Sequence, residues 1–277
     1  MKIIDGKLLA ENLRKKIATE VKKYSRPPGL AVLLVGDDEA SKVYVRNKSK
    51  ACVEVGFYSD QIHKSANITQ EELLSEVKRL NENNNIDGIL VQLPLPDHID
   101  SNAVIESIIP EKDVDGFSSV NIGKLSQNKA FISPCTPKAV MKMLESIKCD
   151  LKGKDCVIIG ASNIVGRPMA MELLNSGATV QVCHKGTKNI TEKTKTADIV
   201  IAAAGAANLV KAEWLKEGAI VIDVGINRQK DGTLTGDVDY EGVKDKVAAI
   251  SPVPGGVGPM TIGVLLENTL IAFKARQ

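Results

Sequence analysis

Short apolar runs rich in β-branched residues recur along the chain and alternate with stretches of helical periodicity. The runs lie at 30–36, 86–96, 155–160, 178–184, 197–205, 218–225 and 247–256. Strands that alternate with helices are typical of parallel sheets with helices packed on their faces. The sequence therefore predicts an α/β protein. Helical patterns over 7–23, 41–55 and 69–83 accompany the strands of its first half.

The length and order of these runs predict two domains. A chain of 277 residues is long enough for two hydrophobic cores. The best candidate for the boundary is the segment 131–146, where two prolines precede a helix. We therefore expect domains at 1–137 and 138–277. The last helix, about 262–277, is able to pack on either domain, including back on the first.

Composition excludes several classes of function. A formal net charge of +2 and only 3% aromatic residues argue against nucleic acid as a partner. No apolar run approaches the ~20 residues that span a bilayer, and the charged N-terminus does not resemble a signal peptide. We expect a cytoplasmic protein without a membrane partner. Five cysteines without CxxC and three scattered histidines give no metal-ligand spacing, so no metal is expected.

One stretch of the second half has the order strand, glycine turn, helix and strand of a dinucleotide site. Gly160 ends the first strand, Gly166 opens the helix, and Gly177 suits its C-terminal cap. Such a turn directs free backbone N–H groups at a pyrophosphate. The spacing is not GxGxxG, because Ser162 replaces the middle glycine and the last glycine comes one residue late. An ordinary tight turn therefore stays the alternative.

The residues after the second strand of this stretch indicate which cofactor binds. An NAD site usually places Asp or Glu there, whereas a basic residue accommodates the 2′-phosphate of NADP. The segment CHKGTK carries Lys185 and Lys188 and no acid. It favours NADP over NAD. A solvated loop lysine is the alternative, and it suits Lys188 better than Lys185.

The basic stretch 41–55 contains a lysine that is a candidate for catalysis. At about 100° per residue, one side of this helix is a solvated face: Lys42, Arg46, Ser49 and Lys50. The opposite, apolar side holds Tyr44, Lys48, Ala51, Cys52 and Val55. We expect Ser41 to cap the helix just after the carboxyl end of a strand, where ligands bind in open α/β sheets. An amine on that side, hydrogen-bonded by Tyr44, suits proton transfer, although a stem that reaches solvent is the alternative.

Three further segments carry polar or turn residues at strand ends. Gln92 lies in LVQLPLP, at the end of another predicted strand. In DVDG, one buried carboxylate is able to pair with the amino groups of a heterocycle; a plain acidic turn suits Asp113 better than Asp115. The loop 251–261 holds three glycines and three prolines, which combine rigidity with close backbone approach to a ligand.

Taken together, YVRNK, ILVQLPLP, DVDGF, PCTP, GASNIVGRPM and PVPGGVGPMT resemble one family, in the same order and nearly from end to end. It is the bifunctional methylenetetrahydrofolate dehydrogenase/methenyltetrahydrofolate cyclohydrolase family. The resemblance implies an N-terminal three-layer α/β catalytic domain and a C-terminal Rossmann-like NAD(P)-binding domain with a cleft between them. It also implies tetrahydrofolate derivatives as substrates, NADP as cofactor and a homodimer formed through the Rossmann domain.

The resemblance also implies roles for individual residues. Lys48, Tyr44, Gln92 and Asp115 match its catalytic positions, Asp115 being the carboxylate that holds the pterin. Further expected substrate contacts are Val91, Leu93, Pro252, Pro254, Gly255, Gly256, Gly258 and Pro259. Expected cofactor contacts are Thr136, Gly160, Ala161, Ser162, Ile164, Val165, Lys185 and Ile226. The family often has arginine at position 161, where it touches the 2′-phosphate, so Lys185 is expected to take over that contact.

Two other functions fit parts of this pattern. A monofunctional member of the family, or a dehydrogenase of another small substrate, would share the fold and perform one reaction. A non-catalytic dinucleotide sensor would bind NADP without folate, but it leaves a lysine on an apolar helix side without a reason.

Overall fold

The computed structural model describes residues 1–277, which form two compact units. Unit 1 comprises Met1–Ala10 and Thr136–Thr261, and unit 2 comprises Glu11–Cys135 and Ile262–Gln277. This division differs from the expected 1–137 and 138–277 at both ends of the chain. The last helix packs with the first domain, the alternative that the sequence left open, and the first ten residues belong to the other unit than expected. They join unit 1 because β1 (Lys2–Ile3) pairs in parallel with β11 (Ala249–Ile250). Helices α1 (Gly6–Val21) and α10 (Val257–Lys274) have residues in both units.

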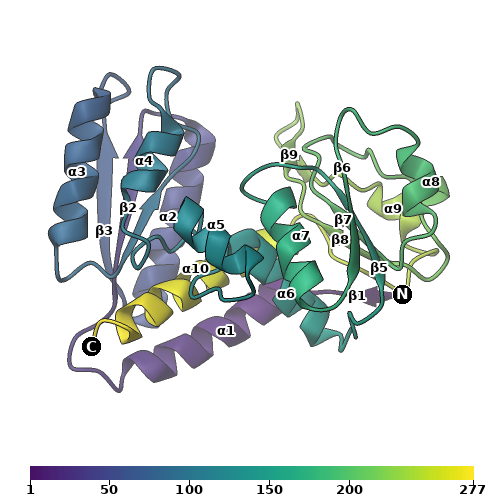
Figure 1. Ribbon diagram of the computed structural model, residues 1–277, viewed down its shortest axis with the longest axis horizontal. Coiled ribbons are helices and arrows are strands. Elements are labelled where there is room, and N and C mark those ends of the chain that lie inside the picture. Colours follow the sequence, from purple (N-terminus) through teal and green to yellow (C-terminus); the bar gives the residue numbers. More distant parts are fainter. The chain divides into compact units, whose positions relative to one another are not determined.

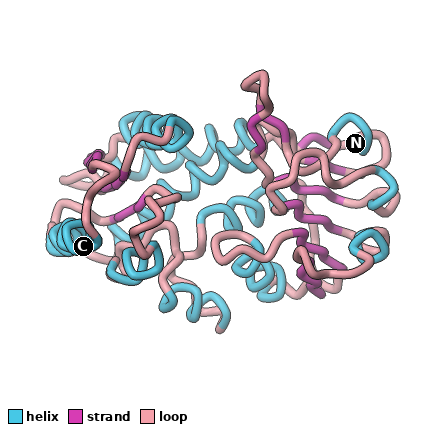
Figure 2. The backbone as a smooth tube through the Cα atoms, turned by 90° about the horizontal axis from the view of Figure 1, so that it is seen from above, coloured by secondary structure: helices cyan, strands magenta, loops and turns pink.

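Unit 1 is built on a six-stranded parallel sheet with the order β1-β11-β8-β7-β5-β6. Its other strands are β5 (Asp155–Ile159), β6 (Thr179–Cys183), β7 (Ile199–Ala202) and β8 (Ile220–Asp223). Figure 2 shows these strands in a row with helices on both sides. The four predicted strands between 155 and 225 are confirmed. The fifth, expected over 247–256, is limited to β11, because Pro252 cannot continue the ladder.

Helices cover both faces of this sheet. Figure 1 shows α6 (Cys135–Ser146) and α7 (Gly166–Asn175) on one face, with α8 (Ile190–Thr194) and α9 (Tyr240–Val243) on the other. The remaining elements of unit 1 are the short helix η1 (Ala212–Trp214) and the antiparallel pair β9 (Asn227–Arg228) and β10 (Leu234–Thr235). The central strands β5, β7 and β8 are buried and apolar, whereas β6 lies at the edge and exposes polar side chains.

Unit 2 contains a three-stranded parallel sheet with the order β3-β2-β4. Its strands are β2 (Gly29–Val35), β3 (Tyr58–Lys64) and β4 (Gly88–Val91). Helices α3 (Gln70–Glu82) and α4 (Ser101–Ser107) pack on one face through a shared apolar core. Helix α2 (Glu39–Val55) packs on β2 and β3, and α5 (Ser119–Ser126) follows α4. The sequence did not predict β3, because this edge strand reads YSDQIHK and is only half-buried.

The end of the chain belongs to unit 2, where α10 lies beside α1 (Figure 1). Lys274 forms an ion pair with Glu20 at 2.7 Å, and the Phe273 ring packs edge-on against Tyr24 with centroids 4.9 Å apart. No helix in the structure has the length and apolarity needed to cross a bilayer.

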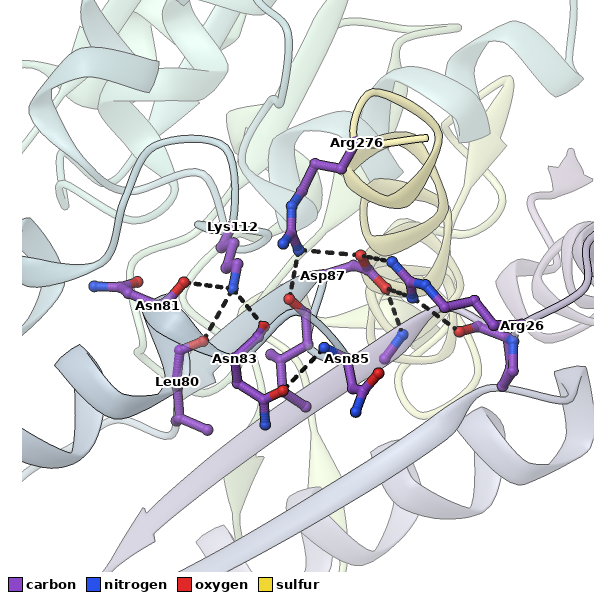
Figure 3. Close-up of polar contacts among 11 residues, drawn as sticks. Arg26, Leu80, Asn81, Asn83, Asn85, Asp87, Lys112 and Arg276 are labelled. Atoms are coloured by element: carbon purple, nitrogen blue, oxygen red, sulfur yellow. Dashed lines mark hydrogen bonds and ion pairs between the residues drawn. The ribbon is translucent and has the colours of Figure 1, made fainter.

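A buried polar cluster lies at the amino end of β4 (Figure 3). The Asp87 carboxylate, which immediately precedes β4, accepts hydrogen bonds from both terminal nitrogens of Arg26 at 2.7 and 2.9 Å. It also accepts from the Gly29 amide at 2.9 Å and from Arg276 at 3.1 Å. A buried carboxylate is stable only when its acceptors are satisfied in this way. Asp87 therefore joins the start of β2, the start of β4 and the chain end.

Lys112 is a further charged residue in Figure 3, and its side chain is fully buried. Its amine donates to the carbonyl oxygens of Leu80, Asn81 and Asn83 at 3.0, 2.7 and 2.8 Å. These carbonyls belong to the C-terminal end of α3, where helical acceptors lack partners. Burial lowers the pKa of Lys112 to about 8, and the charge of Arg276 adds to this effect.

We predict that Lys112→Met lowers the free energy of unfolding by about 2 kcal/mol at pH 7, because the carbonyls of Leu80, Asn81 and Asn83 each lose the hydrogen bond from the Lys112 amine. An unfolded lysine titrates near pH ~10.4, so above about pH 8 the folded state binds fewer protons than the unfolded state and gains stability as the pH rises. The difference between the wild type and Lys112→Met should therefore grow from pH 8 to pH 10 in urea titrations.

Lys78→Met, at an exposed position of α3, is the matched control and should change stability by less than about 0.5 kcal/mol. A difference between the wild type and Lys112→Met that shrinks over this pH range would contradict the lowered pKa.

Candidate active site

The Lys48 amine is held at the carboxyl edge of the unit 2 sheet. Its Nζ donates to Oε1 of Gln92 at 3.0 Å. Gln92 follows β4 directly, and its backbone N–H donates to Leu33 of β2 at 2.8 Å. Its side-chain Nε2 donates to the Leu93 carbonyl at 2.7 Å. Because the nitrogen of the amide is thus engaged, its oxygen faces the lysine. Both ends of the Gln92 residue are fixed by backbone contacts.

Helix α2 places Lys48 at the edge of its buried face. The buried residues of this helix are Ser41, Val45, Ser49, Ala51, Cys52 and Val55. The prediction that Ser49 is solvated is wrong, because a short serine side chain fits against the core where a longer polar one would not. Tyr44 and Lys48 are consequently half-buried. Ser41 is not the cap either: the helix begins at Glu39, and the Asp38 carboxylate accepts from the Ser41 amide at 2.7 Å.

Tyr44 lies one helical turn before Lys48. Burial raises the pKa of its hydroxyl, so the phenol stays protonated over a wide pH range. The expected hydrogen bond from Tyr44 to the lysine amine is not formed, and the amine donates to Gln92 instead. The two side chains are neighbours on the helix surface because residues four apart share a face. Tyr44 therefore stands beside the Lys48–Gln92 pair.

Asp115 lies in the electrostatic field of Lys48. Burial raises the pKa of the Asp115 carboxyl, and the nearby Lys48 charge opposes this shift. The negative charge of Asp113 raises the pKa further, whereas the nearby Cys135 thiol lowers it. The carboxyl group is thus packed among protein atoms, although part of the residue reaches the surface. A carboxylate in such a place can accept hydrogen bonds from N–H groups of a ligand.

Asp113 builds the turn that carries Asp115. Its buried carboxylate accepts from the backbone amides of Gly116, Phe117 and Ser118 at 3.0, 3.3 and 2.8 Å. It also accepts from Nδ2 of Asn121 at 2.9 Å. Asp113 lies in an acidic turn, as expected. Its carboxylate also determines the shape of that turn, because it binds three of the turn's backbone amides.

A small cavity adjoins this turn. Val91, Leu93 and Asp115 line it, together with Phe117 and other apolar side chains of unit 2. The expected substrate contacts from the first half, Val91 and Leu93, are thus brought beside Asp115. The remaining expected substrate contacts, Pro252, Pro254, Gly255, Gly256, Gly258 and Pro259, belong to unit 1. They form one loop and the first turn of α10 after β11.

The loop after β11 depends on close backbone contacts. A Cβ at Gly256 would overlap with the Pro252 carbonyl, and a Cβ at Gly6 would overlap with the Gly256 carbonyl. The Lys7 amide donates to the Gly255 carbonyl at 2.9 Å. The glycines are therefore needed for the loop to pack on the N-terminal segment of unit 1.

The glycine turn after β5 has the geometry of a phosphate-binding turn. Gly160 has φ +130°, and a Cβ there would overlap with the carbonyl of Ala203, which follows β7. A Cβ at Gly166 would overlap with the Gly160 carbonyl, so α7 starts tightly against the turn. The strands that follow β5 lie on its opposite sides, β6 on one and β7 on the other. Ligands bind at such switch points in open α/β sheets.

Ser162 explains the unusual spacing of this turn. Its Oγ accepts from the Val165 amide at 3.2 Å, and its carbonyl accepts from Arg167 at 3.0 Å. Ala161, Ile164 and Val165 complete the turn, and the side chains of Ser162 and Ile164 are exposed. The first turn of α7 carries no acid that would repel an anion. The glycine cradle and the uncharged helix start fit a dinucleotide phosphate.

The other expected cofactor residues of unit 1 take different positions. Lys185 is exposed in a tight turn after β6, where the His184 amide donates to Thr187 Oγ1 at 2.9 Å. Ile226 follows β8 and is 44% exposed. Because the strands are parallel, Gly160, Lys185 and Ile226 share one edge of the sheet. Thr136 lies at the start of α6, with Oγ1 3.3 Å from Thr261 Oγ1.

Two buried carboxylates at this edge were not foreseen from the sequence. Asp223 accepts from the amides of Gly225, Asp237 and Val238, each at 2.9 Å, and burial raises its pKa to about 6. Asp237 accepts from the amides of residues 204 to 206 and from Asn227. They tie the loops after β7 and β8 to the β9–β10 hairpin. The only sequence signal was an acid that ends an apolar run, IVID.

No group of three or more His, Cys, Asp or Glu side chains in the structure is arranged to hold a metal ion.

Two family models match the chain. The catalytic-domain model of tetrahydrofolate dehydrogenase/cyclohydrolase matches residues 4–115, and its NAD(P)-binding-domain model matches residues 134–277.

Relatives and solved structures match over nearly the full length. The chain is 61% identical over 276 residues to the bifunctional protein FolD of Vesicomyosocius okutanii, with 100% of both chains covered. A Campylobacter jejuni FolD methylenetetrahydrofolate dehydrogenase/cyclohydrolase structure has 51% identity, a TM-score of 0.97 and 100% coverage of both chains. The Trypanosoma brucei FolD structure, complexed with NADP cofactor and inhibitor, has 42% identity, a TM-score of 0.94 and 99% and 97% coverage.

Proposed function

Because the chain belongs to the tetrahydrofolate dehydrogenase/cyclohydrolase family, we propose that it performs two successive reactions on one-carbon folates. It oxidises 5,10-methylenetetrahydrofolate to the 5,10-methenyl cation with NADP. It then hydrolyses this cation to 10-formyltetrahydrofolate: water adds to the methenyl carbon, the bond from that carbon to one ring nitrogen breaks, and one proton is released. Assay of both half-reactions on one preparation distinguishes this enzyme from a monofunctional relative.

The observation that carries the proposal is the Lys48 amine held by Gln92 at 3.0 Å beside the Asp115 carboxyl. Hydrolysis of the methenyl cation requires protons to leave the adding water and to reach the departing ring nitrogen. An amine at a fixed position performs such transfers well. The amide of Gln92 is itself held by the Leu93 carbonyl, so the amine has a defined place before the substrate arrives.

Each neighbour of Lys48 has a separate role in this proposal. Asp115 accepts hydrogen bonds from the N–H groups of the pterin, and the charge of Lys48 compensates its negative charge. Tyr44, which keeps its proton, bounds the site next to the amine. Val91 and Leu93 provide apolar contacts beside Asp115. By resemblance, the proline and glycine positions between 252 and 259 also contact the folate.

The residues of unit 1 fit NADP as the cofactor. When bound, NADP would supply the hydride acceptor for the oxidation. The turn formed by Gly160, Ala161, Ser162, Ile164 and Val165 presents its backbone to the phosphates. Lys185 pairs with the 2′-phosphate, a contact that Ala161 is unable to make. The positions of Thr136 and Ile226 match cofactor contacts of the family, and the Trypanosoma brucei relative was solved with NADP bound.

We also propose that two copies of the chain associate through the dinucleotide-binding unit and that the enzyme works in the cytoplasm. The family resemblance supports the dimer, and five cysteines without CxxC spacing fit the reducing cytoplasm. Light scattering of the purified protein should give twice the mass of one chain, and the mass of a single chain would rule the dimer out.

Lys48→Met should lower the rate of methenyltetrahydrofolate hydrolysis at least ~100-fold, because the proton carrier is lost. Folate binding should stay measurable, since Asp115 is unchanged. The decay of methenyltetrahydrofolate absorbance measures the first effect, and equilibrium titration with tetrahydrofolate measures the second. Lys50→Met, an exposed position of the same helix, is the matched control and should leave both unchanged. Wild-type hydrolysis by Lys48→Met would refute proton transfer by this lysine.

Lys185→Ala should raise the KM for NADP about tenfold, because a hydrogen bond to a charged group contributes about 1.5–3 kcal/mol. The KM for NAD should not change, since NAD lacks the 2′-phosphate. Initial dehydrogenase rates with each cofactor in parallel give both values. Lys188→Ala, three residues on, serves as control and should leave both constants near the wild type. Equal efficiency of the wild type with NAD and NADP would contradict the assignment of NADP.

A further inference from the structure

Helix α10 buries an asparagine among apolar side chains. Asn268 is fully buried, as are its helix neighbours Leu265 and Leu266. A buried amide costs free energy unless its hydrogen bonds are made. Neither the proposed chemistry nor the packing of α10 requires an amide at this position, so its contacts indicate what it does.

The Asn268 side chain joins two segments that are distant in the chain. Its Nδ2 donates to the Val114 carbonyl and to the Ser133 carbonyl, both at 2.9 Å. It also lies 3.6 Å from the Cys135 sulfur. The Val114 carbonyl accepts a second hydrogen bond, from the Cys135 thiol at 3.2 Å. Two side chains therefore hold the peptide group that links Val114 to Asp115.

This peptide group sets the direction in which Asp115 leaves the backbone. On the other side of the turn, the Asp113 carboxylate holds the amides of Gly116, Phe117 and Ser118. The Val114 side chain between them is fully buried. A carboxylate that recognises a planar ring needs a position fixed within about 0.5 Å. Asp113 and Asn268 together restrict the backbone before and after Asp115.

The neighbouring residue of α10 shows the contrast. Thr269 is also fully buried, but its hydroxyl donates to the Leu265 carbonyl within the same helix, at 2.8 Å. Its polar contact is local and satisfies the hydroxyl alone. Asn268 instead directs both amide protons away from its own helix, one to the Val114 carbonyl in the turn that carries Asp115 and the other to the Ser133 carbonyl.

We propose that Asn268 is a positioning residue that acts on folate binding through Asp115. This inference rests on the proposed role of Asp115 in holding the pterin. Loss of the amide frees the Val114–Asp115 peptide group to rotate, and the carboxylate then meets the pterin N–H groups with poorer geometry. Folate affinity falls in both half-reactions, whereas NADP affinity is unaffected.

The test compares Asn268→Leu, Thr269→Val and the wild type by equilibrium titration with tetrahydrofolate. Asn268→Leu should raise the Kd for tetrahydrofolate at least about tenfold, because the hydrogen bonds to the Val114 and Ser133 carbonyls are lost. It should raise the KM for methylenetetrahydrofolate alike and leave the KM for NADP unchanged. Thr269→Val loses one buried hydrogen bond without touching the turn, and it should change neither. If Asn268→Leu does not fold, Asn268→Ser, which keeps a hydroxyl of shorter reach, takes its place.

Asp115→Asn and the double variant separate positioning from general stability. Residues that act through one another are not additive, so Asn268→Leu should cause little further loss of affinity once Asp115 is replaced. Equal losses in both backgrounds would overturn the positioning role. An unchanged Kd in Asn268→Leu, together with a raised Kd in Asp115→Asn, would also overturn the positioning role. That result would leave the proposed role of Asp115 standing. An unchanged Kd in Asp115→Asn would overturn the role of Asp115 itself, and the positioning role with it.

Discussion

The hydrogen bond between the Lys48 amine and Gln92 is the contact on which the proposed chemistry depends. It exists because two parallel strands end at the same edge of the unit 2 sheet. Helix α2 begins shortly after β2 and delivers Lys48, whereas Gln92 follows β4 directly. Parallel strands bring their carboxyl ends together, so residues 44 positions apart meet at 3.0 Å. At the other end of β4, Asp87 stabilises the start of this strand through its hydrogen bonds, and Lys112 stabilises the C-terminal end of α3.

Unit 1 uses the same principle with different residues. Gly160, Lys185 and Ile226 follow three parallel strands and therefore share one edge. The turn after β5 is specified by close approach, because a side chain at Gly160 or Gly166 would overlap with backbone atoms. Ser162 replaces the middle glycine of the usual spacing and uses its own hydroxyl to close the turn. The departure from GxGxxG spacing is thus compatible with a tight turn between β5 and α7.

Much of this could be predicted from the sequence, because strand ends and glycine turns are local features. The strands of unit 1, the start of α7 at Gly166 and the positions of Lys48 and Gln92 near the carboxyl ends of strands follow from them. Features that depend on tertiary packing could not. Strand β3 has an edge pattern without apolar continuity, and Ser49 is buried only because the core leaves room for a small side chain. Asn268 and Asp237 act through backbone groups of distant segments, which no spacing in the sequence reveals.

A crystal structure of the protein with bound tetrahydrofolate tests the central claim most directly. We expect the pterin N–H groups to donate to the Asp115 carboxylate. The Lys48 amine should still be bound to Gln92 and should point at the side of the ring that carries the one-carbon unit in the substrates. A pterin bound away from Asp115, or a Lys48 amine that leaves Gln92 and turns to solvent in the complex, would contradict the proposed site.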